Sequence, residues 1–181
     1  LTKDTPTRVV RSPMVQLQTR QVDQANVELF TVNSPEASYW RLTSLETFDG
    51  DIWKSGYSTE DADGELPREL DPASETEPVH QTFTITQLRS VWLPAAFEPR
   101  AIDTGDDDQP ADFDERSSTL LVDRRVDTSD GYNYDVDSAV PHWSPEELHA
   151  ASPEIPGEIA DVFLDLPGNF PDRVVDEAEK V

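Results

Sequence analysis

Alternation of apolar and polar side chains predicts two β-strands, each with one buried face. In the first strand, Val79, Phe83 and Ile85 share one face, and histidine and threonine occupy the other, at residues 80, 82, 84 and 86. In the second, residues 132–137, tyrosine or valine alternates with asparagine or aspartate. Successive side chains of a strand point to opposite faces, so each strand would have one solvent-exposed face. This is typical of an antiparallel sandwich or open barrel and argues against a buried parallel sheet.

Short β-branched and aromatic runs, broken by proline, Asp-Gly and acidic clusters, extend this pattern over most of the chain. The predicted strands span residues 7–17, 26–32, 38–48, 51–55, 79–86, 118–123 and 132–139. We therefore expect a mainly β fold, an antiparallel β-sandwich or open barrel, over residues 1–140. Strand order is not visible in the pattern, so no immunoglobulin-like topology is singled out.

The strongest local hairpin signal is the dipeptide Asp49-Gly50, which suits a type I′ turn. A two-residue turn would pair Phe48 with Asp51, and period-2 counting then defines one apolar face of the hairpin. The side chains expected on this face are Trp40, Leu42, Phe48 and Trp53.

Two acid-rich stretches, residues 60–78 and 103–116, interrupt the β pattern, and we expect mobile surface loops there. They contribute to an extreme overall charge, since the chain has 38 acidic and 14 basic residues and a net charge of −24. Such a surface repels phosphate backbones and anionic lipid headgroups. The charge therefore argues against a nucleic-acid partner and against peripheral membrane binding.

Residues 141–181 have a different character, with short helices and a proline-rich exit. Ser144-Pro145-Glu146-Glu147 predicts a capping box with Ser144 as the N-cap of a helix that ends near Ala151. Further helical turns are expected at 158–164 and 172–181. The chain starts at Leu1 and its last predicted helix has no C-cap glycine, so we expect it to be an excerpt that leads into a further, absent domain.

Candidate catalytic and metal-binding patterns are weak throughout. The chain has no cysteine, hence no thiolate nucleophile or thiolate metal ligand. The three histidines, His80, His142 and His149, match no zinc-site spacing, and no G-x-S-x-G motif is present. With so many acids, a close carboxylate pair suited to glycoside hydrolysis is expected by chance. We assign no catalytic, cofactor-binding or metal-binding residue and no cofactor.

Calcium is the one metal that the acidic clusters suggest, because it prefers oxygen ligands. Residues 59–70 place Gly64 where an EF-hand needs glycine, but Thr59 and Leu70 stand where acidic ligands belong. An irregular calcium site at Asp106, Asp107 and Asp108 is a weaker alternative to a plain solvated loop. A calcium-stabilised adhesion domain therefore stays open as a third reading.

Aromatic side chains offer a possible sugar-stacking surface. The candidates are Trp40, Trp53, Trp92, Trp143, Tyr39 and Tyr57. For the strand tryptophans Trp40, Trp53 and Trp92 we favour a place in the core, because apolar residues flank them. Trp143, which directly precedes the N-cap, is interpreted as a hydrophobic staple.

The run YWRLTSLETFDGDIW at residues 39–53 resembles a hallmark segment of the bacterial and archaeal membrane-bound transglutaminase-like (TgpA-like) proteins. Further segments are similar in the same order along the chain. They are RSPMV at 11–15, VELFTV at 27–32, QTFTI at 81–85, WLPAAFEP at 92–99 and FLDLP at 163–167.

The resemblance implies a parent protein with a bundle of membrane helices, an extracytoplasmic region and a papain-like transglutaminase core that uses cysteine, histidine and aspartate. This chain resembles only the region between bundle and core. The catalytic cysteine has no counterpart here, so none of the active-site residues can be carried over. The implied location is the outer face of the cytoplasmic membrane, and the implied partner is the rest of the same polypeptide.

We therefore expect a non-catalytic extracytoplasmic β domain that positions or flanks a transglutaminase-like core. The alternative is a module that binds cell-wall glycan or peptide through its aromatic and acidic surfaces, with cell-envelope polymers as partners. Exposure of the tryptophans separates the two, because core tryptophans are shielded and platform tryptophans are open to solvent.

Overall fold

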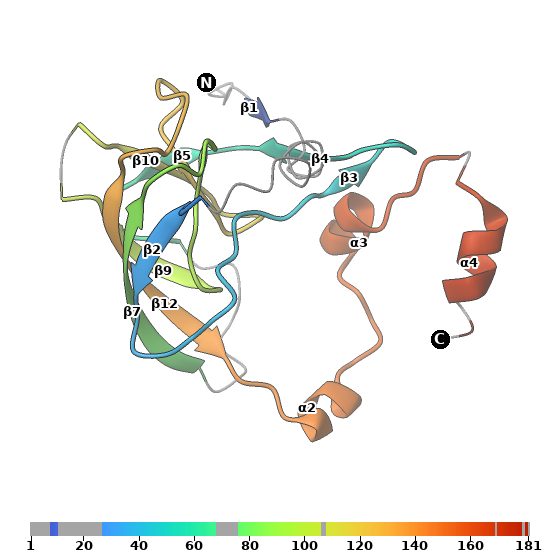
Figure 1. Cartoon of the computed structure of the whole chain (residues 1–181). Coiled ribbons are helices and arrows are strands. Elements are labelled where there is room, and N and C mark those ends of the chain that lie inside the picture. Colours follow the sequence, from blue (N-terminus) through green and yellow to red (C-terminus); the bar gives the residue numbers. More distant parts are fainter. Residues whose placement is uncertain are drawn as a thin grey trace, which may run out of the picture. The chain divides into compact units, whose positions relative to one another are not determined.

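The structure, a computed structural model, describes residues 8–10, 27–67, 76–105, 108–168, 170–178 and 180. The chain divides into two compact units (Figure 1). Unit 1 comprises residues 1–8, 25–44 and 57–151, and unit 2 comprises residues 9–24, 45–56 and 152–181. No helix among the described residues has the length and apolar character needed to cross a membrane.

Unit 1 contains two antiparallel sheets. The larger sheet has the strand order β2-β7-β12-β9-β6. Its strands are β2 (Phe30–Asn33), β7 (Thr76–Ile85), β12 (Asn133–Pro141), β9 (Pro99–Asp103) and β6 (Gly64–Glu65). The smaller sheet has the order β5-β10-β11-β8. Its strands are β5 (Glu60–Ala62), β10 (Ala111–Asp114), β11 (Thr119–Val122) and β8 (Trp92–Leu93). The predicted mainly antiparallel β fold is thereby confirmed.

One hydrophobic core receives side chains from both sheets, as in a sandwich. Phe83 on β7 is fully buried at its centre. Its ring lies 5.9 Å from that of Phe30, 5.6 Å from that of Trp40 and 5.2 Å from that of Tyr134. Aromatic pairs at such separations add to the stabilisation that burial alone provides.

The alternation predicted for the two long strands is confirmed by their burial. Along β7, Val79, Gln81, Phe83 and Ile85 are buried and the residues between them are exposed. β7 and β12 run side by side (Figure 1), and Phe83 is opposite Tyr134 in their register. The larger sheet therefore has one face in the core and one face in water.

The acid-rich stretches differ from the expected surface loops, because both contain strands. β5 and β6 lie within residues 60–78, and β10 lies within 103–116. β5 belongs to the smaller sheet and β6 to the larger one, so the chain changes sheet between Ala62 and Gly64. Gly64 makes this corner with a φ of 77°, a conformation that glycine adopts without a steric cost. Alternation in Ala111-Asp112-Phe113-Asp114 is the strand signal that the acidic composition concealed.

The predicted hairpin exists, but its register and extent differ from the prediction. β3 (Thr47–Phe48) pairs with β4 (Trp53–Tyr57) through Phe48 opposite Trp53, so the turn holds four residues rather than two. Asp49 shapes this turn, since its carboxylate accepts from the amides of Asp51 and Ile52. The hydrogen bond from the Lys54 ammonium, followed by these two hydrogen bonds from amides, holds the pKa of Asp49 far below its usual value.

The single apolar face predicted for the hairpin is also wrong. Residues 38–46 form no continuous strand and meet the sheets only through a bridge between Arg41 and Ala95. Trp40 and Leu42 pack against the core of unit 1, whereas Phe48 and Trp53 belong to unit 2. Trp53 is 38% exposed, so its predicted place in the core is wrong.

The short helices agree with the prediction. Helix α2 (Pro145–Ala150) has Ser144 as its N-cap, Pro145 in its first turn and the complete capping box with Glu147. Helices α3 (Gly157–Phe163) and α4 (Asp172–Ala178) follow in unit 2. There, β1 (Arg8–Val10), β4 and β3 form a small three-stranded sheet.

Three predicted features lie partly outside the described residues. They are the rest of the strand at 7–17, Leu70 of the EF-hand comparison, and Asp106 and Asp107 of the irregular calcium site. The domain boundary at residues 140 and 141 stays a prediction.

Candidate functional site

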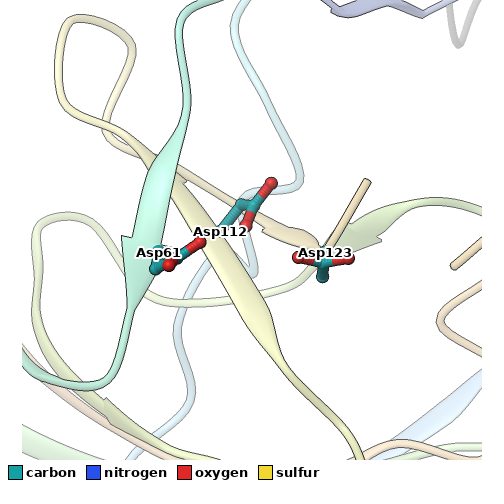
Figure 2. A group of neighbouring side chains, drawn as sticks. All are labelled: Asp61, Asp112 and Asp123. Carbon is teal, nitrogen blue, oxygen red and sulfur yellow. The ribbon is translucent and has the colours of Figure 1, made fainter. Parts of the chain in front are cut away.

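The arrangement nearest to a metal site is a group of three aspartates in the smaller sheet, the aspartate cluster (Figure 2). Asp61 on β5 stands opposite Asp112 on β10, and Asp123 directly follows β11. One carboxylate oxygen of each residue lies within 4.8 Å of the other two. Asp112 and Asp123 are buried, whereas Asp61 is exposed. The EF-hand comparison of residues 59–70 included the position of Asp61, but no sequence pattern pointed to the other two, because only strand pairing brings them close to it.

Neighbouring side chains already bind the buried carboxylates of this cluster. Arg125 contacts both oxygens of Asp123, with Nε at 2.7 Å from Oδ1 and an Nη at 3.2 Å from Oδ2. The same guanidinium lowers the pKa of Asp123. Thr59 donates its hydroxyl to Asp112 across 3.1 Å. A buried carboxylate needs such partners, since an unpaired buried charge is costly.

A cavity of about 300 Å³ opens beside the cluster and is lined in part by Asp61, Asp63, Asp103, Asp123 and Arg125. Carboxylate oxygens of this kind are the ligands that a calcium ion prefers. The guanidinium of Arg125 already binds the carboxylate of Asp123, however, and a metal cation would have to compete with it. The described geometry therefore explains the buried aspartates as a protein-satisfied network.

Asp114, at the end of β10, has a structural role in the β10–β11 turn. It is almost completely buried and accepts hydrogen bonds from the amides of Ser58 and Ser117 and from the Ser117 hydroxyl. A carboxylate that accepts several such bonds is held in one orientation. The acidic sequence of this stretch thus encodes a turn as well as surface charge.

The three histidines have separate surroundings. His80, exposed on β7, contacts Asp137 at 2.8 Å and Asp135 at 3.6 Å, and the hydrogen bond to Asp137 raises its pKa. His142 lies 3.2 Å from Glu77. His149 is hydrogen-bonded to a backbone carbonyl of its own helix. None of these contacts joins one histidine to another.

The aromatic candidates are divided between core and surface. Trp92 is 2% exposed and Trp40 packs half-buried against Phe83, so both belong to the interior. Tyr39 is 98% exposed and Trp143 is 52% exposed, so neither packs in the core. The side chain of Tyr57 lies outside the described residues.

Arg41, in the middle of the run YWRLT, fixes this segment to the smaller sheet. Its guanidinium donates to the carbonyl oxygens of Ser117 and Ser118 at 2.5 and 3.0 Å. It also lies 5.2 Å from the ring centre of Phe97, within range of a cation–π interaction. The backbone of Arg41 exchanges two hydrogen bonds with Ala95. The segment is therefore a structural clamp between residues distant in sequence.

The run WLPAAFEP is anchored by a second buried polar network. Gln81, with no exposed surface, accepts from the amide of Ala96 at 2.8 Å and donates to the hydroxyl of Ser138 at 3.0 Å. Ser138 in turn donates to the carbonyl of Ala96, and Tyr134 donates to that of Pro94 at 2.8 Å. Burial raises the pKa of Tyr134, so its hydroxyl stays a donor well into the alkaline range. These polar groups bind one another rather than facing a cavity.

Comparison with known proteins gives one result. A family model described as the TgpA N-terminal domain matches residues 2–145. No curated protein and no solved structure gives a match. The matched range covers the two sheets of unit 1 together with the hairpin of unit 2. The assignment of no catalytic, cofactor-binding or metal-binding residue stays a prediction.

Proposed function

The chain belongs to the TgpA N-terminal domain family, and from this premise we propose that it is an extracytoplasmic, non-catalytic domain that positions the transglutaminase-like core of a membrane protein. The family assignment fits a non-catalytic part of such a protein. The positioning role, the location and the enzymatic activity of the parent protein are parts of the proposal.

The observation that supports this proposal is the set of contacts made by two of the segments that resemble the family, YWRLT and WLPAAFEP. Arg41 ties one segment to the backbone of the smaller sheet, and Gln81 ties the other to the larger sheet. Both act through contacts inside the domain, which are part-buried for Arg41 and buried for Gln81. Side chains that make hydrogen bonds within the domain give it a rigid shape. A rigid shape suits a domain that holds another domain in place.

A linker insertion in the full-length membrane protein tests the positioning role. Ala151 and Ser152 are exposed and lie at a junction between the two units, so a flexible Gly/Ser insertion of about ten residues there should leave both units folded. We expect amine incorporation into a glutamine-containing protein substrate to fall by about tenfold or more.

The matched control carries the same insertion between Glu36 and Ala37, which are exposed and lie within unit 1. It should keep its activity. Unchanged activity with the linker after Ala151, in a protein that melts at the same temperature, would show that the domain is only a tether.

The location has its own test, which uses the absence of cysteine from this chain. In the full-length protein, Tyr39→Cys places a thiol at a 98% exposed position. In intact cells or spheroplasts, a membrane-impermeant maleimide should label this variant above the level of the unmodified full-length protein, and Ala111→Cys, at a 4% exposed position, should add no label. Labelling of Tyr39→Cys only after lysis would contradict an extracytoplasmic location.

The second candidate function is binding of cell-wall glycan, and it is favoured by one observation. Tyr39 is almost fully exposed although its neighbours Trp40 and Arg41 are anchored. An exposed ring on a fixed backbone can stack on a sugar. Cosedimentation with purified peptidoglycan should then be lost in Tyr39→Ala and kept in Trp53→Ala, whereas equal sedimentation of both variants would remove this candidate.

A further inference from the structure

Unit 2 has many large apolar side chains on its surface. The exposed set in its C-terminal part consists of Ile155, Ile159, Leu164, Leu166, Val174 and Val175, here named the C-terminal apolar face. Their exposed fractions run from 36% to 54%. Single exposed apolar residues are ordinary, but six of them within residues 155–175 give this part of the chain an unusually apolar surface, which is typical of a segment that contacts a partner.

Among the described residues of this face, those of helix α4 illustrate its exposure best. None of its residues is buried, and Val174 and Val175 are more than 40% exposed. Helical spacing puts Val174, Val175 and Ala178 on one side, and charged residues on the other. A helix of seven residues is marginal in water without tertiary packing. Its apolar side therefore needs a surface to pack against.

The charges around this face restrict what that surface can be. Among the described side chains from residue 152 to residue 178, the acidic ones are Glu154, Asp161, Asp165, Asp172, Asp176 and Glu177. Arg173 is the basic residue of the same range, and Lys180 beyond it is paired with Glu177 at 2.8 Å. A second copy of this chain or an anionic bilayer would bring like charges together, which is unfavourable.

We propose that the C-terminal apolar face docks into an apolar groove on a protein surface flanked by lysine and arginine side chains. The valines of α4 would fill the groove, and Asp172 and Asp176 would meet the basic rim. Apolar contacts in such an interface supply affinity, and the complementary charges supply orientation and a fast encounter. The inference goes beyond the proposed positioning role, because it defines the contacting surface and the chemistry of its partner.

Site-specific photo-crosslinking in the full-length protein, in its own membrane, tests this inference. Val175 is replaced by p-benzoylphenylalanine, and the crosslinked peptide is identified by mass spectrometry. We expect one defined protein segment with lysine or arginine beside apolar residues, and a crosslinking yield that falls several-fold as salt rises. No crosslink, a crosslink to lipid, or a crosslink to a second copy of this chain would overturn the inference.

Two controls sharpen the experiment. The same photoreactive residue at Tyr39, which is exposed in unit 1, should not reach that segment. Charge reversal in Asp172→Lys/Asp176→Lys should lower the yield at Val175 several-fold with no change in melting temperature, and an unchanged yield would overturn the basic character of the partner. The crosslink can form even where the linker insertion leaves activity unaltered, so this inference and the positioning role fail independently.

Discussion

The two units of the chain bury their apolar residues to very different degrees. In unit 1, Phe83, Tyr134 and Val136 are at most 2% exposed and lie between two sheets. In unit 2, Trp53 is more than a third exposed and helix α4 has no buried residue. Burial of apolar area is the main source of stability, so we expect unit 1 to be the more stable of the two and the described part of unit 2 to be the less stable. We therefore expect unit 1 to provide most of the stability of the chain and unit 2 to provide its interaction surface.

The largest expected effect comes from the centre of the aromatic cluster. Phe83→Ala should lower the free energy of unfolding by about 3–5 kcal/mol, since it removes a buried ring in contact with three others. Urea titration of the purified chain measures this loss. A loss below about 1 kcal/mol would contradict the view that both sheets share one core.

A tryptophan pair compares the two units directly. Trp92→Ala, at a 2% exposed site, should cost about 3–5 kcal/mol, whereas Trp53→Ala, at a 38% exposed site, should cost only about 1–2 kcal/mol. Acrylamide should correspondingly quench Trp53 and Trp143 and spare Trp92. Equal losses in the two variants would mean that the hairpin is as tightly packed as the sandwich.

The Arg41 clamp should have an intermediate effect. Arg41→Ala removes two hydrogen bonds from a charged group to backbone carbonyls and should cost about 1.5–3 kcal/mol. Arg41→Lys should recover only part of this, because an ammonium lacks the planar fork that reaches both Ser117 and Ser118. Full recovery of stability in Arg41→Lys would mean that only the positive charge of Arg41 matters, and not its two hydrogen bonds.

A smaller, pH-dependent effect is expected at His80. Its pKa is raised above 6.5 in the folded chain, mainly by the hydrogen bond to Asp137, so its stabilisation is present below that pH and is lost as pH rises through the folded pKa. The melting temperature of wild type relative to His80→Gln should therefore fall between about pH 6 and pH 8. A difference that is constant or grows with pH would contradict the ion pair.

The smallest effect is expected on the C-terminal apolar face. Val175→Ala in the isolated chain should change the free energy of unfolding by less than about 0.5 kcal/mol, because the side chain is 41% exposed and belongs to a helix without buried residues. The same urea titration reports it, with Phe83→Ala as the reference. A loss near that of Phe83→Ala would place α4 within a packed core.

The sequence predicted those elements whose signal is local. Alternation identified β7 and β12, and the Ser144–Glu147 pair identified the start of α2. Local signals also covered the turn at Asp49, although its two-residue length was wrong because the carboxylate of Asp49 stabilises a four-residue turn.

What the sequence missed depends on contacts between distant residues. Asp112 and Asp114 were interpreted as loop residues, because composition does not show that Thr59, Ser58 and Ser117 will satisfy them in the interior. The aspartate cluster likewise exists only once β5, β10 and β11 are paired. The exposed position of Trp53 follows from its membership of unit 2, which apolar flanking residues do not reveal.

Hydrogen exchange on the isolated chain tests the contrast between the two units most directly. We expect the amides of β7 and β12 to exchange only through global unfolding, and those of α4 to exchange with little protection. The result that would contradict the account is equal, strong protection of α4 in the isolated chain, since the C-terminal apolar face would then already be stabilised without a partner.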